Sequence, residues 1–325
     1  MTPGLPAEPA SQPGRPRVLG ALAIAVGSAS FASILIRWAQ PYAPSLAIAA
    51  YRLSIAALVL WPILLVRSRR RPLRLSSAVI GMTILSGALL GLHFGTWITS
   101  LAFTSVASSA VLVATAPLFV ALLAPATLGE RVPARLYGGL ALGLLGTLVI
   151  AASGVCAPAW PPDCTGRTGP LSSQALVGDL LALAGAVTVA GYLLIGRSLR
   201  HRVALLPYLT LTYTVAALCL VLATAIARLP LAGYPAEALG LFALLAIFPQ
   251  LIAHSTYNWA VRHAAAAPVA LTLLGEPVGA ILLAAILLQE RPDGLELAGI
   301  ALILIGIWLG ARPARRTGTT AAQTA

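Results

Sequence analysis

The sequence predicts an all-α integral membrane protein in which ten transmembrane helices form two inverted five-helix repeats. The first observation is compositional. The 325 residues are 59% hydrophobic and only 9% charged, whereas a soluble domain carries about 25% charged residues. The mean hydropathy of +0.91 agrees with this contrast. The chain therefore has too few charged side chains to cover a surface that faces water.

The second observation is an internal repeat with a period of 160 residues. Matching residues recur in the pairs Pro117 and Pro277, Glu130-Arg131 and Glu290-Arg291, Gly139 and Gly299, and Gly146 and Gly306. Each copy holds an odd number of spans, so the second copy must cross the bilayer in the opposite direction. Inverted repeats place a pseudo-twofold axis in the membrane plane, with a site between the halves.

Ten apolar runs supply the spans, since a helix needs about 20 apolar residues to cross a bilayer. In order they cover 18–37, 43–66, 77–99, 105–127, 134–153, 176–196, 205–227, 238–261, 265–288 and 295–312. The chain thus divides into a disordered cytoplasmic tail, a first five-helix repeat, an extracytoplasmic linker loop, a second five-helix repeat and a cytoplasmic tail, at 1–17, 18–153, 154–175, 176–312 and 313–325. The first run also fits a secretory signal peptide, but its removal would leave the sixth run without a partner.

The basic residues are all arginine, and their positions predict the orientation. With the N-terminus inside, sixteen lie in cytoplasmic segments: Arg15, Arg17, Arg67, Arg69, Arg70, Arg71, Arg74, Arg131, Arg135, Arg197, Arg200, Arg202, Arg262, Arg312, Arg315 and Arg316. Four lie outside: Arg37, Arg167, Arg228 and Arg291. Cytoplasmic loops are enriched in arginine, so both termini are expected in the cytoplasm, with the protein in the cell (inner) membrane. The arginines form brief runs between apolar segments, so the net charge of +12 does not indicate nucleic acid.

Two charged residues lie near the centre of predicted spans, Arg52 in the second and Glu276 in the ninth. A charge at a span centre costs about 2.5–3.5 kcal/mol on insertion scales, so such residues usually serve a function. We predict that both belong to a substrate or ion pathway, in which Glu276 binds a proton or acts as a counter-charge for a substrate amine. The alternative is structural: the two residues pair with each other or satisfy carbonyls at helix breaks, and so hold the bundle together, with Arg52 as a clamp.

Pro117 and Pro277 occupy equivalent places in the fourth and ninth spans. Each lacks an N–H and frees the carbonyl four residues earlier, at Val113 or Leu273, so both helices are expected to kink. Freed carbonyls at mid-depth are tolerated only against protein or a water-filled cavity. We therefore predict a central cavity lined by the third, fourth, eighth and ninth spans. The alternative is that proline is simply common in membrane helices.

Two pairs of residues are spaced by four positions and so share a helical face: His93 with Trp97, and His254 with Asn258. Tyr257 adds a hydroxyl next to the second pair. We predict that these residues line the mouth of the cavity and hydrogen-bond a polar solute. The alternative is an aromatic belt at the membrane interface.

Cys156 and Cys164 flank a proline-rich loop on the expected extracytoplasmic side. A disulfide between them and two free thiols are both open at this point. No cysteine or histidine spacing matches a metal site, and no P-loop is present. We therefore predict no metal, no cofactor and no enzymatic activity.

Two shorter features concern packing. The Gly139-x-x-x-Gly143 spacing in the fifth span predicts close approach of a neighbouring helix. The repeated pair Glu130-Arg131 is expected to form local ion pairs or helix caps, which would fix the turn between the fourth and fifth spans.

Several short motifs occur in a characteristic order: Arg52, the turns Leu128–Arg131 and Leu288–Arg291, Gly178-Asp179-Leu180 and Glu276-Pro277. In this order they resemble the drug/metabolite transporter (DMT) superfamily, and within it the EamA-type transporters. The resemblance covers about residues 18–312. It implies an inner-membrane carrier that works by alternating access and exports amino acids, related metabolites or drugs.

We therefore expect a secondary transporter, an exporter of small metabolites such as amino acids or drugs, with a central cavity between the two repeats. A lipid or lipid-linked-sugar flippase is the alternative, and a lateral opening between spans would favour it. A membrane enzyme fits less well. The expected partners are a small-molecule substrate, the lipid bilayer and, if transport is coupled, protons. A monomer and a homodimer both remain open.

Overall fold

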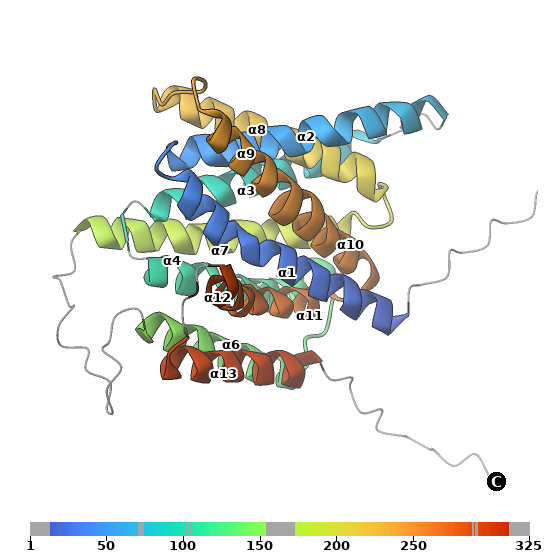
Figure 1. Cartoon of the computed structure of the whole chain (residues 1–325). Coiled ribbons are helices and arrows are strands. Elements are labelled where there is room, and N and C mark those ends of the chain that lie inside the picture. The colour runs from blue at the N-terminus through green and yellow to red at the C-terminus, as the bar shows by residue number, and fades with distance from the viewer. Residues whose placement is uncertain are drawn as a thin grey trace, which may run out of the picture.

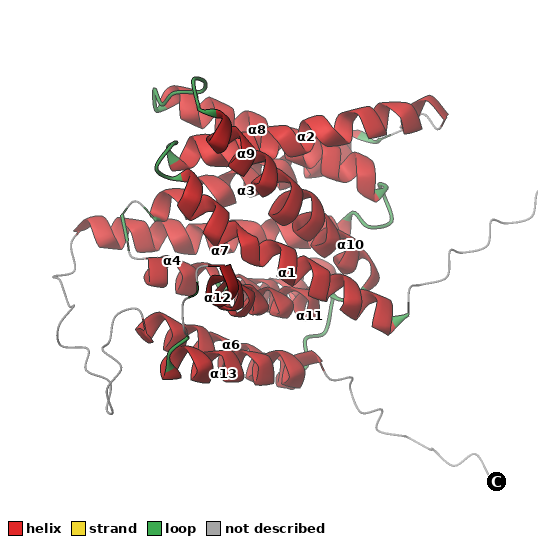
Figure 2. Ribbon diagram, viewed as in Figure 1, coloured by secondary structure: helices red, strands yellow, loops and turns green. Residues whose placement is uncertain are grey.

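The computed structural model describes residues 14–70, 75–101, 103–104, 106–153, 173–287, 289 and 292–311. Within these ranges the protein is helical, without strands, and short loops join the helices (Figure 2). Cys156 and Cys164 lie outside the described residues.

The first half of the chain contains α1 (Arg15–Ala39), α2 (Ser45–Arg70), α3 (Ser77–Ser100), α4 (Val106–Val113), α5 (Ala116–Leu128) and α6 (Ala134–Ser153). The second half contains α7 (Ser173–Ser198), α8 (Leu205–Ile226), α9 (Ala236–Leu245), the π-helix η1 (Ala246–His254), α10 (Ser255–His263), α11 (Ala266–Leu271), the 3-10 helix η2 (Thr272–Leu274), α12 (Gly275–Leu287) and α13 (Gly294–Ala311). In this part of the chain nine helical segments are long and apolar enough to cross a membrane, and a shorter apolar helix covers Ala134–Ile150. The predicted all-helical membrane fold is confirmed.

The repeat is visible in the turn that follows the first span of each half. After α1, the amides of Tyr42 and Ala43 both donate to the carbonyl of Ala39, over 3.0 and 3.2 Å. After α7, the amide of Val203 donates to the carbonyl of Leu199 over 3.2 Å, which places the same turn 160 residues later. The two halves therefore share local structure as well as sequence.

The contact between α6 and α13 shows how the halves are related. A Cβ atom on Gly139 would lie 2.5 Å from the carbonyl oxygen of Gly306, and one on Gly146 would lie 2.6 Å from that of Gly299. Gly139 corresponds to Gly299 and Gly146 to Gly306, so exchanging each glycine with its counterpart returns the same two contacts. A twofold axis has this property. The predicted inverted repeat is confirmed, and Figure 1 shows the two helices side by side at one edge of the bundle.

The same symmetry orders the remaining interfaces. The second spans of the two halves, α2 and α8, pack against each other. Helix α3 packs along α7, and in the same way α9, η1 and α10, which together correspond to α3, pack along α1, which corresponds to α7. Close backbone approach replaces large side chains at several of these crossings, as expected where lipid supplies no hydrophobic driving force.

Both spans that carry the paired prolines are interrupted. Helix α4 ends at Val113 and α5 begins at Ala116, so Pro117 falls in its first turn, where a missing N–H costs nothing. In the ninth span, η2 separates α11 from α12, and Pro277 follows directly after the start of α12. The eighth span holds a second irregularity, since η1 contains Pro249.

Candidate functional site

Arg52 lies inside the bundle with only 1% of its surface exposed. Its Nε donates to Oε1 of Gln250 over 2.9 Å. Its guanidinium carbon lies 4.2 Å from the ring centroid of Phe94, a cation–π contact. Among the described residues Arg52 forms no ion pair with a carboxylate, so the expected alternative of an Arg52–Glu276 pair is not the arrangement seen.

Gln250 reaches Arg52 because the eighth span is wound as a π-helix at this point. Pro249 cannot supply the N–H that an α-helix needs, and a π turn absorbs this break within the span. Gln250 is fully buried, and its backbone carbonyl accepts the hydroxyl of Tyr213 over 3.3 Å. The sequence already offers Gln250 as a polar group of the eighth span, and Tyr213 in the seventh span as a weaker candidate of the same kind. Tyr192 in α7, which binds Asn258, is the site residue that our sequence predictions missed.

Asn258 forms the next part of the cluster. Its Nδ2 donates to the hydroxyl of Tyr192 and, over 2.8 Å, to the carbonyl of His254. The ring of His254 lies 5.4 Å from that of Phe94, between centroids. Phe94 therefore contacts both Arg52 and His254, and it connects the residues of the eighth span to the buried arginine.

Glu276 belongs to the first turn of α12, where the helix dipole favours a carboxylate. The hydroxyl of Tyr257 donates to its Oε1 over 3.1 Å, and Ser30 in α1 donates to its backbone carbonyl over 3.2 Å. Tyr257 is 1% exposed, whereas Glu276 is half-buried. Water-sized space therefore remains next to Glu276.

His93 contacts the other repeat directly. Its Nδ1 lies 2.9 Å from the carbonyl oxygen of Gly185 in α7, and since a carbonyl only accepts, this nitrogen carries the hydrogen. The imidazole stacks on Trp97, with centroids 5.7 Å apart. His93 is 5% exposed and Asn258 1%, so these two side chains face protein rather than forming a belt at the membrane interface.

Four polar atoms of this cluster are buried and have no hydrogen-bond partner within the described structure. They are Nη1 of Arg52, Nε2 of Gln250, Nδ1 of His254 and Oδ1 of Asn258. Buried polar groups without partners are rare, because each loses its hydrogen bonds to water on burial and gains no bond to the protein in return. A polar ligand or water entering the cluster would find donors and an acceptor ready to bind it.

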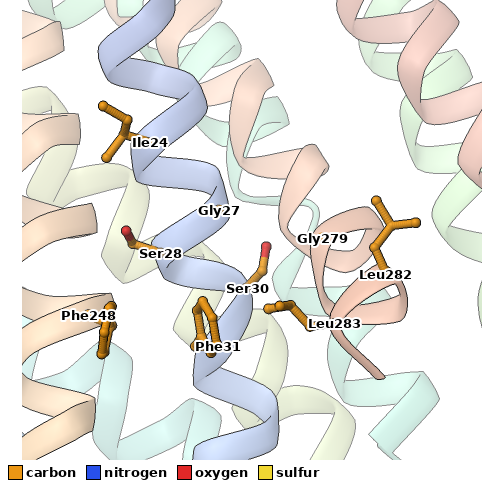
Figure 3. Close-up of a pocket in the computed structure, with 9 residues that line it drawn as sticks. All are labelled: Ile24, Gly27, Ser28, Ser30, Phe31, Phe248, Gly279, Leu282 and Leu283. Carbon is orange, nitrogen blue, oxygen red and sulfur yellow. The ribbon is translucent and has the colours of Figure 1, made fainter. Parts of the chain in front are cut away.

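A groove opens next to this cluster, between α1, η1 and α12. It has a volume of about 420 Å³ and is lined by Ile24, Gly27, Ser28, Ser30, Phe31, Phe248, Gly279, Leu282 and Leu283. Figure 3 shows Ser30 pointing from α1 toward α12, close to Gly279. Because Ile24 and Leu282 on its rim are 61% and 51% exposed, the groove opens sideways to the surface of the bundle.

Glu130 is positioned differently from our expectation of a local ion pair or cap. Its Oε1 accepts Nε of Arg197 over 2.6 Å, and its Oε2 accepts the amide of Ala266 over 2.9 Å. Both partners belong to the second half of the chain, while the adjacent Arg131 is exposed. The expectation was wrong for Glu130 because a partner distant in sequence was closer in space.

The predicted site residues therefore differ in where the structure places them. Six share the buried cluster or its edge: Arg52, His93, His254, Tyr257, Asn258 and Glu276. Trp97 joins it through its stack on His93, and Pro277 is the neighbour of Glu276. Pro117 is buried in α5, and the two cysteines of the linker are not described.

Comparison with known proteins agrees with this architecture. The family model of the EamA-like transporter family matches twice, at residues 17–152 and 176–311. A solved structure, described only as the crystal structure of a protein, has a TM-score of 0.71 and 18% identity over 91% of this chain and 96% of that chain. Its likeness concerns the fold alone. None of the curated proteins compared with the chain matches it. Two family matches that cover both halves place this multi-pass membrane protein in the EamA-like transporter family.

Proposed function

We propose that the protein is a secondary transporter that exports small metabolites, such as amino acids or drugs, by alternating access through a central cavity between its two repeats. The observation that carries this proposal is the buried cluster. It holds an arginine and a carboxylate that are not paired with each other, at the junction of the halves. A protein that needed these charges only for stability would gain by joining them, since a lone buried charge is costly.

The cluster suits a solute with both charges. Nη1 of Arg52 and Nε2 of Gln250 are free donors for a carboxylate, and arginine binds carboxylates in a planar, bidentate manner. Glu276 offers its second carboxylate oxygen to an amine, while Tyr257 holds the first. An amino acid, or an amine-bearing drug at the Glu276 end, fits this arrangement.

The proposed orientation places both termini in the cytoplasm of a cell whose inner membrane holds the protein. The arginine distribution supports it. In this orientation α5 ends, and α11 begins, at the cytoplasmic face. Cysteines introduced at Arg70 and Ala232 test it: an impermeant thiol reagent added to intact cells should label position 232 and leave position 70 unlabelled, and the reverse would overturn the assignment.

Transport by Glu276→Gln in proteoliposomes tests the function. The amide keeps an oxygen for Tyr257, so folding should be retained. Transport of amino acids or cationic drugs should fall by about tenfold, because a hydrogen bond to a charged group is worth about 1.5–3 kcal/mol. Glu237→Gln is the matched control, since Glu237 also lies in the first turn of a helix but is exposed. Unchanged transport in Glu276→Gln would contradict the assignment.

The same variant separates two roles for the carboxylate. If Glu276 carries the coupling proton, the variant should lose transport driven by a pH gradient but keep exchange of labelled for unlabelled substrate. If it is a fixed counter-charge, both measurements should fall together.

A lipid or lipid-linked-sugar flippase is the second candidate, because the groove between α1 and α12 opens sideways. Gly27→Leu would fill this groove, since nothing lies within 4 Å of a Cβ placed there. Loss of lipid translocation in this variant, with amino-acid transport absent from the wild type, would favour the flippase. Gly20→Leu is the control, because Gly20 also has open space on α1 but lies outside the groove.

A further inference from the structure

We infer that Glu130 is a gate latch, which in this conformation holds shut the end of the pathway where α5 ends and α11 begins. The inference rests on the proposed function, because a latch acts only in a carrier that alternates. Glu130 is then a positioning residue for transport rather than a substrate ligand.

One carboxylate joins three elements. Its two oxygens bind Arg197, at the end of α7, and the amide of Ala266, at the start of α11. Arg197 is fixed in turn, since its Nη1 donates to the carbonyl of Val261 over 2.8 Å. The side chains of Glu130 and Arg197 are 15% and 13% exposed. These bonds are charge-assisted and partly shielded from water, which makes them stronger than a surface ion pair.

The backbone delivers Glu130 to this position. Helix α5 ends at Leu128, and Gly129 adopts a left-handed conformation with φ of 64°. Glycine enters that region without steric cost, whereas other residues are strained there. The chain therefore leaves the helix at Gly129, and Glu130 is presented to the other half. Since α5 and α11 belong to the two interrupted spans, the contact closes the gap between the segments best placed to move.

In an inverted repeat the two states of a carrier are related by exchange of the conformations of the halves. The state described here is latched at the Glu130 end, and in the other state Arg197 would be free of Glu130.

Accessibility of a single cysteine tests the latch without a transport assay. Ala114 lies at the break between α4 and α5 and is half-buried. The full chain would carry Ala114→Cys, with Cys156, Cys164 and Cys219 replaced by serine. The rate of labelling by an impermeant thiol reagent would be measured from each side, in inside-out and right-side-out vesicles. The ratio of the two rates reports the balance between the states.

Glu130→Gln should shift this ratio toward the Glu130 end by about tenfold, which corresponds to about 1.4 kcal/mol. Arg197→Gln should shift it in the same direction, which covers the case that Glu130→Gln does not fold. Arg131→Gln, next to Glu130 and exposed, should leave it unchanged.

An unchanged ratio in both Glu130→Gln and Arg197→Gln would overturn the latch. A wild type that is labelled from one side only, with and without amino-acid substrate, would instead contradict the proposed alternating function. The two failures are therefore distinguishable.

Discussion

The third span of each repeat has the same place in the fold, but the two are built differently. In the first half it is α3, an unbroken α-helix. In the second half it is α9, η1 and α10, with a π-helix at its centre. When His93 is matched with His254, Gln250 corresponds to Leu89. An amide that binds the buried arginine thus stands where the other repeat has an apolar side chain.

Their neighbours differ in the same direction. His93 is bonded to Gly185, which the looser match between α1 and α7, offset by 158 residues, pairs with Gly27. Nδ1 of His254 has no partner in the described structure, and Gly27 lines the groove. One repeat uses this span to pack, and the other uses it to present unsatisfied polar groups. The two repeats therefore share a sequence pattern, but their third spans serve different purposes.

The largest effect is expected from Gln250→Leu, which gives the second repeat the leucine that the first repeat has at the matching position, Leu89. Arg52 would lose its amide partner while remaining buried. The free energy of unfolding should fall by about 1.5–3 kcal/mol, the usual value of a hydrogen bond to a charged group. Thermal unfolding in detergent would measure it. Gln174→Leu, at an exposed position of α7, should have no such effect.

A second test adds a large side chain at each of the two matched glycines, Gly185 and Gly27. A Cβ on Gly185 would lie 3.3 Å from Cβ of Trp97, whereas one on Gly27 would meet nothing within 4 Å. Gly185→Leu should therefore destabilise the protein by about 1–3 kcal/mol through overpacking, and Gly27→Leu should not. Equal losses of thermal stability in the two variants would remove the distinction between the halves.

The smallest effect concerns the histidines themselves. His93→Ala deletes a hydrogen bond between the repeats and should cost about 0.5–1.5 kcal/mol of stability. His254→Ala deletes a side chain whose Nδ1 is unbonded, so stability should hold while the KM for a polar substrate rises several-fold. If His254→Ala proves the less stable of the two, the assignment of packing and binding roles is reversed.

Much of the fold was readable from the sequence because the bilayer imposes it. Apolar runs of the required length predict the spans, and the 160-residue repeat predicts the inversion that Gly139 and Gly306 display. Arg52 and Glu276 were also readable, since few residues are so costly at mid-depth.

The partners of these residues were not readable. Pro249 signals a break in the helix, but the neighbouring helices decide which side chain the break turns inward. Glu130 has Arg131 beside it in sequence, but its bond goes to Arg197 because the tertiary arrangement brings that residue closer. Hydropathy and spacing describe one span at a time, and these bonds depend on several.

The glycine contact between α6 and α13 bears on how a chain of this kind arises. Gly139 meets the repeat counterpart of Gly146, and Gly146 meets that of Gly139, so the interface requires only one sequence. Two copies of a five-span ancestor, inserted in opposite directions, would already form it as a dimer. Fusing the copies into a single gene would preserve that contact and let each copy change separately. The unbroken α3 of one repeat and the polar η1 of the other are a difference of this kind.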